Sequence, residues 1–420
     1  MESLFRNENP TAMITEISGL LPAVEKFKPK LTVFLRDLVR IPSVNGRNPE
    51  KPLVLRIEEE VHQLDLESSR VALQSDRPNI LVRYGQGTDR FALIAHMDTV
   101  AEGDPAAWSI PPFAGEVKAG RILGRGAADN KAGIVCALYT LALMRDLQLI
   151  DPERQQVMFA GVVDEESGAC SPLGVRHLLD SGALQARGAI YTYTSNIVCI
   201  GHRGLIRLEL HARGQSVHAG LAEWHNHVQG ANAVTALSDL LLRLESLEIS
   251  AIVPAGFEQL GVTITPGTMM NGGSFPSIVP DSAYAVVDIR LLPGQSSADV
   301  LELIRAQIHL VESGRPHIAF EMNVTVDIPG ASIPRDHSLA LLAQDYTEAV
   351  TGRRWETAGA GPANEGYMLI GAGIPTLCGF GPTGGNPHAP DEWVEIDSLP
   401  ATVAMYAGMI HEYLNTFKGE

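Results

Sequence analysis

Two polar residues at the end of an apolar run have the types and spacing of a metal centre. Residues 91–100 read FALIAHMDTV, so that five apolar residues precede His96 and Asp98. A short apolar run of this kind is typical of a buried strand, and ligands collect beyond the carboxyl ends of such strands in open α/β sheets. Because side chains alternate along a strand, we expect the Asp98 carboxylate to orient a metal-binding His96. The alternative is a surface loop in which both residues are incidental.

Acidic residues recur at the ends of two further apolar stretches. Asp129 precedes a helix expected over residues 132–144, which is apolar all round and therefore buried. Glu165 and Glu166 follow a strand expected over residues 156–163. Each acid alone could be a solvated loop charge, but a histidine with several carboxylates and no cysteine is the donor set of a catalytic zinc, cobalt or manganese ion. One glutamate can then bind the metal while the other removes a proton from the metal-bound water, as metal-assisted hydrolysis requires.

Other regular elements must position these residues. The apolar pattern predicts a helix over residues 30–39, a strand over 79–83, a helix over 338–350 and a strand over 376–379. Residues 1–28 are expected to form an irregular or weakly helical lead-in. Wholly apolar strands that alternate with helices favour an α/β sheet with helices on both faces.

The pattern of the chain changes near residue 202. Residues 204–214 (GLIRLELHARG) alternate between apolar and polar side chains, which predicts an antiparallel strand with one solvated face. Helices are expected over residues 229–247 and 298–311, and strands over 259–265, 282–292 and 318–326. We therefore predict an α/β catalytic domain with a mixed, mostly parallel sheet, formed by residues 1–201 and 328–420, and an inserted α+β domain over residues 202–327.

Composition limits the classes of partner. A chain of 420 residues, 45% hydrophobic and 19% charged, is globular and too long for one ordinary core. Its formal net charge of −17, without a long basic run, argues against nucleic acid or an anionic membrane as partner. The four cysteines are widely spaced, which suggests neither a disulfide scaffold nor a thiolate zinc site. The polar N-terminus does not read as a signal peptide, and we expect a cytoplasmic protein.

Nine short motifs occur in one order along nearly the whole chain from about residue 30. They are IPSV at Ile41, HMDTV at His96, GRGAADNKAG at Gly124, DEESG at Asp164, GHRG at Gly201, SVHAG at Ser216, VPD at Val279, DIRLLPG at Asp288 and PHAPDEWVEI at Pro387. In these motifs the chain resembles the metal-dependent amidohydrolases and exopeptidases that include acetylornithine deacetylase, succinyl-diaminopimelate desuccinylase, the glutamate-releasing carboxypeptidases and the aminoacylases. So many ordered matches make the resemblance specific.

The resemblance implies a site for two metals. One metal would be held by His96, the bridging Asp129 and a carboxylate after the next strand. The other would be held by Asp129, Glu166 and His388. The peptide bond after Asp129 would be cis, as in the corresponding turn of the family.

The resemblance also implies roles for four further residues. Glu165 would be the general base, and Asp98 would hold the His96 ring. His218 would reach into the active site of a partner subunit and stabilise an oxyanion, although an ordinary strand-end histidine is the alternative. Arg290 would bind the carboxylate of the substrate, although a surface salt bridge is possible there.

The chain departs from the family pattern at one ligand position. Where relatives carry an acid after the strand that leads to GHRG, residues 189–196 read AIYTYTSN, and the position falls on Thr192 or Tyr193. Neither side chain is anionic at neutral pH. We therefore expect one divalent metal per subunit rather than two, with zinc ahead of cobalt or manganese. The alternative is that another acid, such as Asp180, completes the site.

These features predict a metal-dependent hydrolase that cleaves an amide in a small N-acyl amino acid or dipeptide-like substrate bearing a carboxylate. The inserted domain would act as a lid and form a homodimer. A first alternative is a repurposed family member whose one-metal site performs amide formation or isomerisation. A second is a non-catalytic binding protein on the same scaffold.

Overall fold

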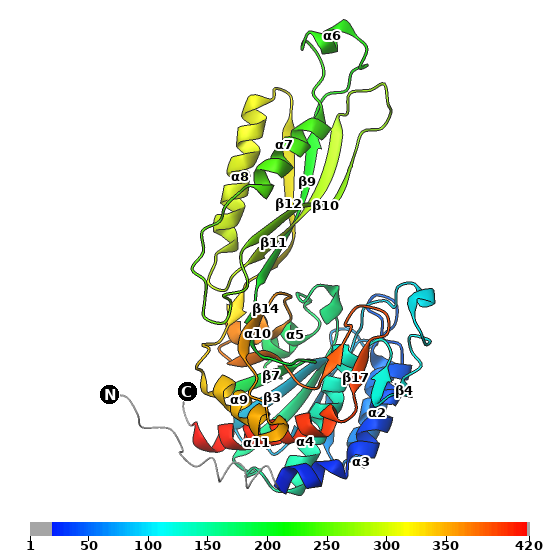
Figure 1. Ribbon diagram of the computed structural model, residues 1–420, viewed down its shortest axis with the longest axis vertical. Coiled ribbons are helices and arrows are strands. Elements are labelled where there is room, and N and C mark those ends of the chain that lie inside the picture. The colour runs from blue at the N-terminus through cyan, green and yellow to red at the C-terminus, as the bar shows by residue number, and fades with distance from the viewer. Residues whose placement is uncertain (1–18, 418–420) are drawn as a thin grey trace, which may run out of the picture. The chain divides into compact units, whose positions relative to one another are not determined.

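The computed structural model describes residues 19–417, and the chain divides into two compact units (Figure 1). Unit 1 runs to Gly201 and resumes over Ser332–Ala360 and from Asn364 onward, whereas unit 2 comprises His202–Ala331 with Gly361–Ala363. The sequence had placed the insertion at residues 202–327. The first eighteen residues of the expected lead-in lie outside the described residues, and residues 19–25 are helical.

Unit 1 is built on a sheet of nine strands, which is mixed, as predicted. In spatial order its strands are β1 (Glu67–Val71), β2 (Asn79–Tyr84), β6 (Gln155–Val162), β3 (Asp89–His96), β7 (Gly188–Thr192), β15 (Thr376–Phe380), β8 (Val198–His202) and β13 (Ala331–Ser332), with β14 (Thr357–Ala360) beside β8. The four neighbours β6, β3, β7 and β15 pair in parallel, whereas β1 with β2, β2 with β6 and β15 with β8 pair antiparallel. The parallel strands therefore bring their carboxyl ends to one edge of the sheet.

Helices bury the faces of this sheet. The longer ones are α2 (Lys28–Arg40), α3 (Lys51–Gln63), α4 (Ala132–Asp146), α9 (Ser338–Thr351) and α11 (Ser398–Thr416), and the short ones are α5 (Val175–Asp180) and α10 (Gly366–Gly371). The helix predicted to be apolar all round is α4, and all its residues from Ala132 to Met144 are buried. It packs against α11 and against β3 and β6. Neither α3 nor α11 was predicted from the sequence.

A small antiparallel sheet in unit 1 joins two distant segments. Its order is β16 (Gly384–Gly385), β17 (Trp393–Glu395), β5 (Arg121–Leu123) and β4 (Glu116–Lys118). Because β17 pairs with β5, the loop around residue 388 lies beside the segment that follows β5. Residues that are more than two hundred positions apart in the chain thereby meet at one place.

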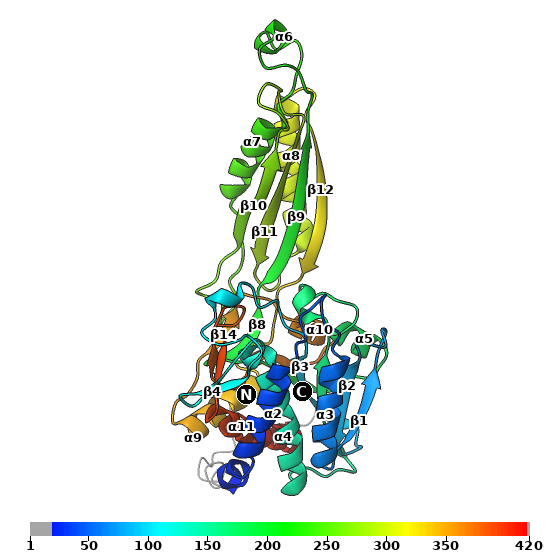
Figure 2. The same cartoon turned by 90° about the vertical axis from the view of Figure 1, so that its right-hand side faces the viewer.

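Unit 2 is a four-stranded antiparallel sheet with two long helices on one face (Figure 2). The order is β10 (Thr263–Gly272), β11 (Ser282–Leu291), β9 (Gly204–Arg213) and β12 (Ala319–Ile328), and the helices are α7 (Ala233–Glu245) and α8 (Ser297–Gly314). Ile206, Leu208 and Leu210 of β9 enter the core beneath these helices. Strand β10 begins at Thr263 and extends beyond the predicted residue 265, because Gly267 and Thr268 form a bulge between the paired residues Pro266 and Met269 rather than a turn that ends the strand.

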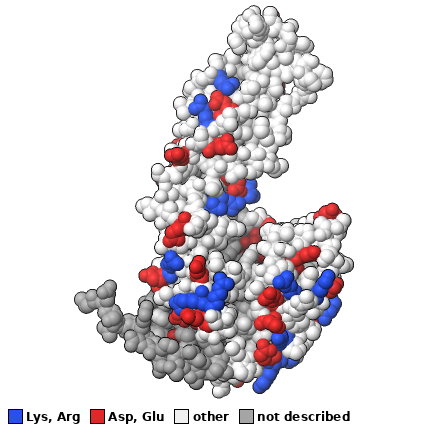
Figure 3. All heavy atoms as spheres, viewed as in Figure 1, with Lys and Arg blue, Asp and Glu red and all other residues white. Residues whose placement is uncertain are grey.

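On the face drawn in Figure 3, basic and acidic side chains of the described residues alternate in small groups, without an extended basic area. Across residues 19–417, no helix combines the length and apolarity that a membrane crossing requires.

Candidate metal centre and active site

Strand β3 brings His96 to the centre of unit 1. The strand pairs in parallel with β6 and β7, and His96 at its carboxyl end is completely buried. The ring nitrogen Nε2 lies 2.7 Å from Oδ1 of Asp129, and Nδ1 lies 2.9 Å from the backbone carbonyl oxygen of Asp98. When Nδ1 donates its proton to that carbonyl, Nε2 carries the lone pair with which a histidine binds a metal.

The Asp98 carboxylate does not hold the His96 ring in the expected way. Its Oδ1 lies 3.8 Å from Nδ1 of His96, which is too far for a hydrogen bond. The carboxylate instead accepts hydrogen bonds from the backbone N–H groups of Glu165 at 3.2 Å and Glu166 at 2.9 Å. The expectation failed because β3 ends at His96, so strand alternation no longer governs the direction of Asp98. Asp98 orients the histidine through its backbone and the two glutamates through its side chain.

Asp129 is fixed by an acid that the sequence analysis did not single out. The Asp129–Asn130 peptide bond is cis, as the resemblance implied. Glu392, completely buried, accepts hydrogen bonds from the N–H groups of Ala128 at 2.8 Å and Asp129 at 2.9 Å. Its other oxygen lies 2.6 Å from Nη1 of Arg125. Glu392 belongs to the motif PHAPDEWVEI, but nothing in that motif marks it as the acid that holds the Asp129 turn.

Four of the predicted ligands meet around Asp129. The donor atoms of His96, Asp129 and Glu166 all lie within 4.8 Å of one another. The Nε2 atom of His388 lies 3.1 Å from Oδ2 of Asp129 and 3.2 Å from Oε1 of Glu166. Two imidazoles and two carboxylates therefore face one another, from the carboxyl ends of β3 and β6, the segment between β5 and α4, and the loop after β16.

The chemistry of this cluster fits a divalent cation. Oε1 of Glu166 is buried and faces Nε2 of His388 at 3.2 Å, so that a cation at this place would have both an oxygen and a nitrogen donor beside it. Burial alone would raise the pKa of Asp129, but hydrogen bonds from His388, His96 and Tyr193 lower it. Hydrogen bonding to Asp129 and then to Glu166 raises the pKa of His388 to about 10. The two carboxylates thus stabilise positive charge between them, and nitrogen and oxygen donors without thiolates suit a catalytic zinc ion.

Tyr193, not Thr192, faces this cluster. Thr192 is the last residue of β7, and its hydroxyl donates to the backbone carbonyl of Ile94 at 2.9 Å. The Tyr193 hydroxyl donates to Oδ2 of Asp129 at 2.5 Å. Burial, followed by the charge of Asp129, raises the pKa of Tyr193 well above its ordinary value, so the phenol stays protonated. Asp180, the alternative acid, lies exposed at the end of α5.

Glu165 lies beside the cluster in the short turn after β6. The turn begins at Asp164 in the left-handed conformation, with φ 69°, and Glu165 is buried. Burial raises the pKa of Glu165 well above the ordinary value of a carboxyl group. A raised pKa makes a carboxylate a stronger proton acceptor, as a general base requires.

The two predicted residues of unit 2 lie in different settings. His218 is exposed in the loop after β9, and its Nδ1 accepts a hydrogen bond from the N–H of Gly220 at 3.0 Å. Arg290 on β11 pairs with Asp288, with Nε at 2.7 Å from Oδ1 and Nη2 at 3.2 Å from Oδ2. The surface-type ion pair that the sequence left open for Arg290 is therefore formed, and Asp288 holds the guanidinium in place.

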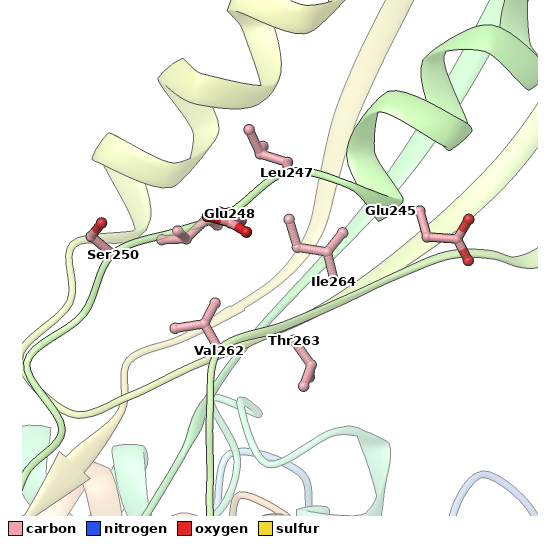
Figure 4. A pocket seen from close by; sticks show the side chains of 8 residues that line it. Glu245, Leu247, Glu248, Ser250, Val262, Thr263 and Ile264 are labelled. Atoms are coloured by element: carbon pink, nitrogen blue, oxygen red, sulfur yellow. The ribbon is translucent and has the colours of Figure 1, made fainter.

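Unit 2 has a cavity of about 570 Å³, and none of its lining residues belongs to the metal cluster (Figure 4). It lies between the end of α7 and the start of β10, and its lining consists of Glu245, Leu247, Glu248, Ile249, Ser250, Val262, Thr263 and Ile264. No histidine or cysteine is among these residues. The carboxyl ends of the unit 1 strands, rather than this cavity, hold the candidate catalytic groups.

The sequence matches a family model and characterised relatives. Residues 92–412 match the model of peptidase family M20/M25/M40. A succinyl-diaminopimelate desuccinylase of Cereibacter sphaeroides is 28% identical over 389 residues, which cover 90% of this chain and 97% of that protein.

Solved structures share the fold at lower sequence identity. Aminopeptidase PepT of Bacillus cereus has a TM-score of 0.71 at 19% identity, over 92% of this chain and 98% of its own. The YxeP protein of Bacillus subtilis, described as a dinuclear metal-binding peptidase, has a TM-score of 0.70 at 16% identity, over 94% of this chain and 100% of its own. These likenesses support the α/β unit with a separate antiparallel unit.

Proposed function

Because the chain belongs to peptidase family M20/M25/M40, and is thereby a hydrolytic enzyme, we propose that it cleaves the amide bond of a small N-acyl amino acid or dipeptide-like substrate. The single observation that carries the proposal is the position of Glu165. A buried carboxylate with a raised pKa follows directly on Asp164 and precedes the cluster residue Glu166. A binding protein would have no physical need for a free base beside a metal site.

The metal would be held by His96, Asp129, Glu166 and His388. When bound, a divalent ion polarises the scissile carbonyl and lowers the pKa of the attacking water. We propose one tightly held ion per subunit, zinc ahead of cobalt or manganese. The support is Tyr193, a neutral phenol that donates a hydrogen bond to Asp129 where the resemblance to the family implies an acid.

Glu165 moves the proton of the reaction. Its carboxylate takes a proton from the attacking water and later donates it to the nitrogen of the leaving amine. The backbone of Glu165 is held by Asp98, so the base does not depend on its own side-chain contacts for its location. Buried surroundings keep the base partly desolvated, which strengthens its electrostatic interactions with charged neighbours.

Unit 2 would complete the site by binding substrate and by forming a homodimer. Arg290 offers a planar guanidinium for the substrate carboxylate, and His218 would reach the active site of the partner subunit. The edge strand β10 exposes Met269 and Met270, which are 64% and 50% accessible, and α7 exposes Leu242. An open strand edge flanked by exposed apolar side chains suits pairing with a second copy of the chain. The widely spaced free cysteines favour the cytoplasm.

The proposal is tested by measuring metal content and hydrolysis together. N-acetyl and N-succinyl amino acids and dipeptides would be offered to the enzyme as purified, after chelation, and after zinc is restored. We expect hydrolysis of at least one class, loss on chelation and recovery with about one equivalent of zinc.

Two other results would select the alternatives. Metal binding without hydrolysis of any class would favour the repurposed enzyme, whose particular support is the altered Tyr193 position. A protein that neither binds metal nor hydrolyses any of these substrates would match the second alternative, a non-catalytic binding protein.

A further inference from the structure

A network of charged and amide side chains leads to the segment that carries Glu165. The Nε atom of Arg77 donates to the Glu50 carboxylate at 2.8 Å, and Nη2 donates to the other oxygen of the same group. Glu50 is completely buried. The Nη1 atom of Arg77 donates to Oδ1 of Asp164 at 2.8 Å. One guanidinium thus compensates two carboxylates that burial would otherwise leave unpaired.

Asn45 extends this network to Asp98. Its Nδ2 donates to Oδ1 of Asp164 at 2.9 Å and to Oδ2 of Asp98 at 2.6 Å. The Ser171 hydroxyl holds the remaining oxygen of Asp164 at 2.5 Å. Both oxygens of Asp164 therefore accept hydrogen bonds. The carboxylates of Asp164 and Asp98, which flank the general base, both accept from the Asn45 amide.

The conformation of Asp164 explains why such contacts are needed. With φ 69° the residue lies in the left-handed region, which a residue bearing Cβ adopts at some cost in free energy. A residue stays in such a conformation when its surroundings hold it there. Asp164 directly precedes Glu165, so its backbone sets the direction in which the chain leaves β6.

We propose that Arg77 and Asn45 are positioning residues for the general base. They clamp the Asp164 side chain and so fix the turn that places the Glu165 carboxylate. The inference rests on the proposed role of Glu165 and adds the residues that hold it. Arg77 and Asn45 act through Asp164 and Asp98, and not through the reacting atoms.

The test is a double-mutant cycle on the zinc-loaded full chain. Arg77→Met should lower kcat about 10- to 100-fold with KM and zinc content unchanged. In the Glu165→Gln background the same substitution should cause no further loss, because the base it positions is absent. The matched control is Arg70→Met, which removes a more exposed pair between Arg70 and Glu58 and should leave kcat unchanged. A loss from Arg77→Met that multiplies with that from Glu165→Gln would overturn the proposal.

Two further variants keep the test decisive if Arg77→Met folds poorly. Arg77→Lys keeps the charge but cannot span Glu50 and Asp164 with a planar fork, and Asn45→Ala removes only the amide bridge. Both should lower kcat and speed hydrogen exchange of residues 163–170 without lowering zinc content. Unchanged kcat and exchange in both variants would contradict the proposal.

The outcome also separates this inference from the proposed function. Near wild-type turnover in Glu165→Gln itself would refute the assignment of Glu165 as general base, and the positioning role of Arg77 and Asn45 would fall with it. Collapse of turnover in Glu165→Gln together with full activity of the Arg77 and Asn45 variants would refute the positioning role alone.

Discussion

The two main sheets distribute polar residues in opposite ways. In unit 1, every residue of β6 is buried, as are the last six of β3, so that neither face of these strands accommodates a charge. In unit 2, β9 alternates, with Leu208 and Leu210 in the core and Arg207 and Glu209 on a partly exposed face. A sheet covered on both faces can present chemistry only at its strand ends, whereas a half-covered sheet can present it along a whole face.

This difference predicts where substitutions change chemistry. The largest effect should come from Glu165→Gln at the end of β6, which keeps size and hydrogen bonding but removes the proton acceptor. We expect turnover to fall on the order of 100-fold or more with metal content unchanged. The matched control is Glu209→Gln on the open face of β9, where the acid accepts a hydrogen bond from the Tyr284 hydroxyl at 3.2 Å and lies 3.9 Å from Nε2 of His211, and where the change should matter little.

Steady-state kinetics with elemental analysis checks this prediction. Turnover of Glu165→Gln within a few-fold of the wild type would remove the base assignment. An equal loss in Glu209→Gln would break the contrast between strand ends and open faces.

The same contrast explains which parts of the molecule could be predicted from the sequence. The elements β3, β6 and α4 were predicted because a long apolar run must be buried in a regular element, and β9 was predicted from its alternation of apolar and polar residues. Strands β4, β5 and β17 have three residues each, which is too short for a periodic pattern. Helix α11 is mostly buried and therefore lacks a polar face that would mark it as a helix.

The site was predictable where residue types at strand ends and the resemblance to a known family pointed to the same positions. His96, Asp129, Glu166 and His388 were named from motifs, and the structure brings them together. The hydrogen bonds of Asp98 could not be predicted, because they depend on where β3 ends. Glu392 was not found, because the chain gives no local sign that an acid far away receives the N–H groups of the Asp129 turn.

The second prediction concerns His218, whose role across a dimer remains a prediction. Glu165→Gln and His218→Ala subunits should each be nearly inactive. In a mixed dimer, one of the two sites combines an intact Glu165 with an intact His218 from the partner, so roughly half of wild-type activity should return. Measurement requires purified heterodimers with a different tag on each subunit.

The control for this experiment is each homodimer at the same concentration. Absence of recovery in a verified heterodimer would mean that His218 does not act across the interface. Full activity of the His218→Ala homodimer would mean that an exposed residue of unit 2 contributes nothing to the chemistry.

The third prediction tests the covered face of the unit 2 sheet. Ile206→Val removes one methylene from the core beneath α7 and α8, where Ile206 is fully buried, and should cost about 0.5–1.5 kcal/mol of unfolding free energy. Arg213→Ala on the same strand removes an exposed pair with Glu321, 75% and 53% accessible, and should change stability by no more than about 0.5 kcal/mol. Chemical denaturation measures both. Equal costs would contradict the division of β9 into two faces.

The smallest expected effect is a twofold change in metal content at the end of β7. Tyr193→Glu places a carboxylate where a phenol now donates to Asp129. A carboxylate supplies both a negative charge and a strong oxygen donor, which a neutral hydroxyl does not. The bound metal should therefore rise from about one ion per subunit toward two at matched zinc concentration.

Tyr193→Phe is the matched control, because it keeps the ring, removes the hydroxyl and adds no ligand, and its stoichiometry should stay near one. Elemental analysis of the three proteins decides the matter: two firmly held ions in the wild type would show that the existing donors already fill both positions, and an unchanged count in Tyr193→Glu would show that this strand end does not lie at a ligand position.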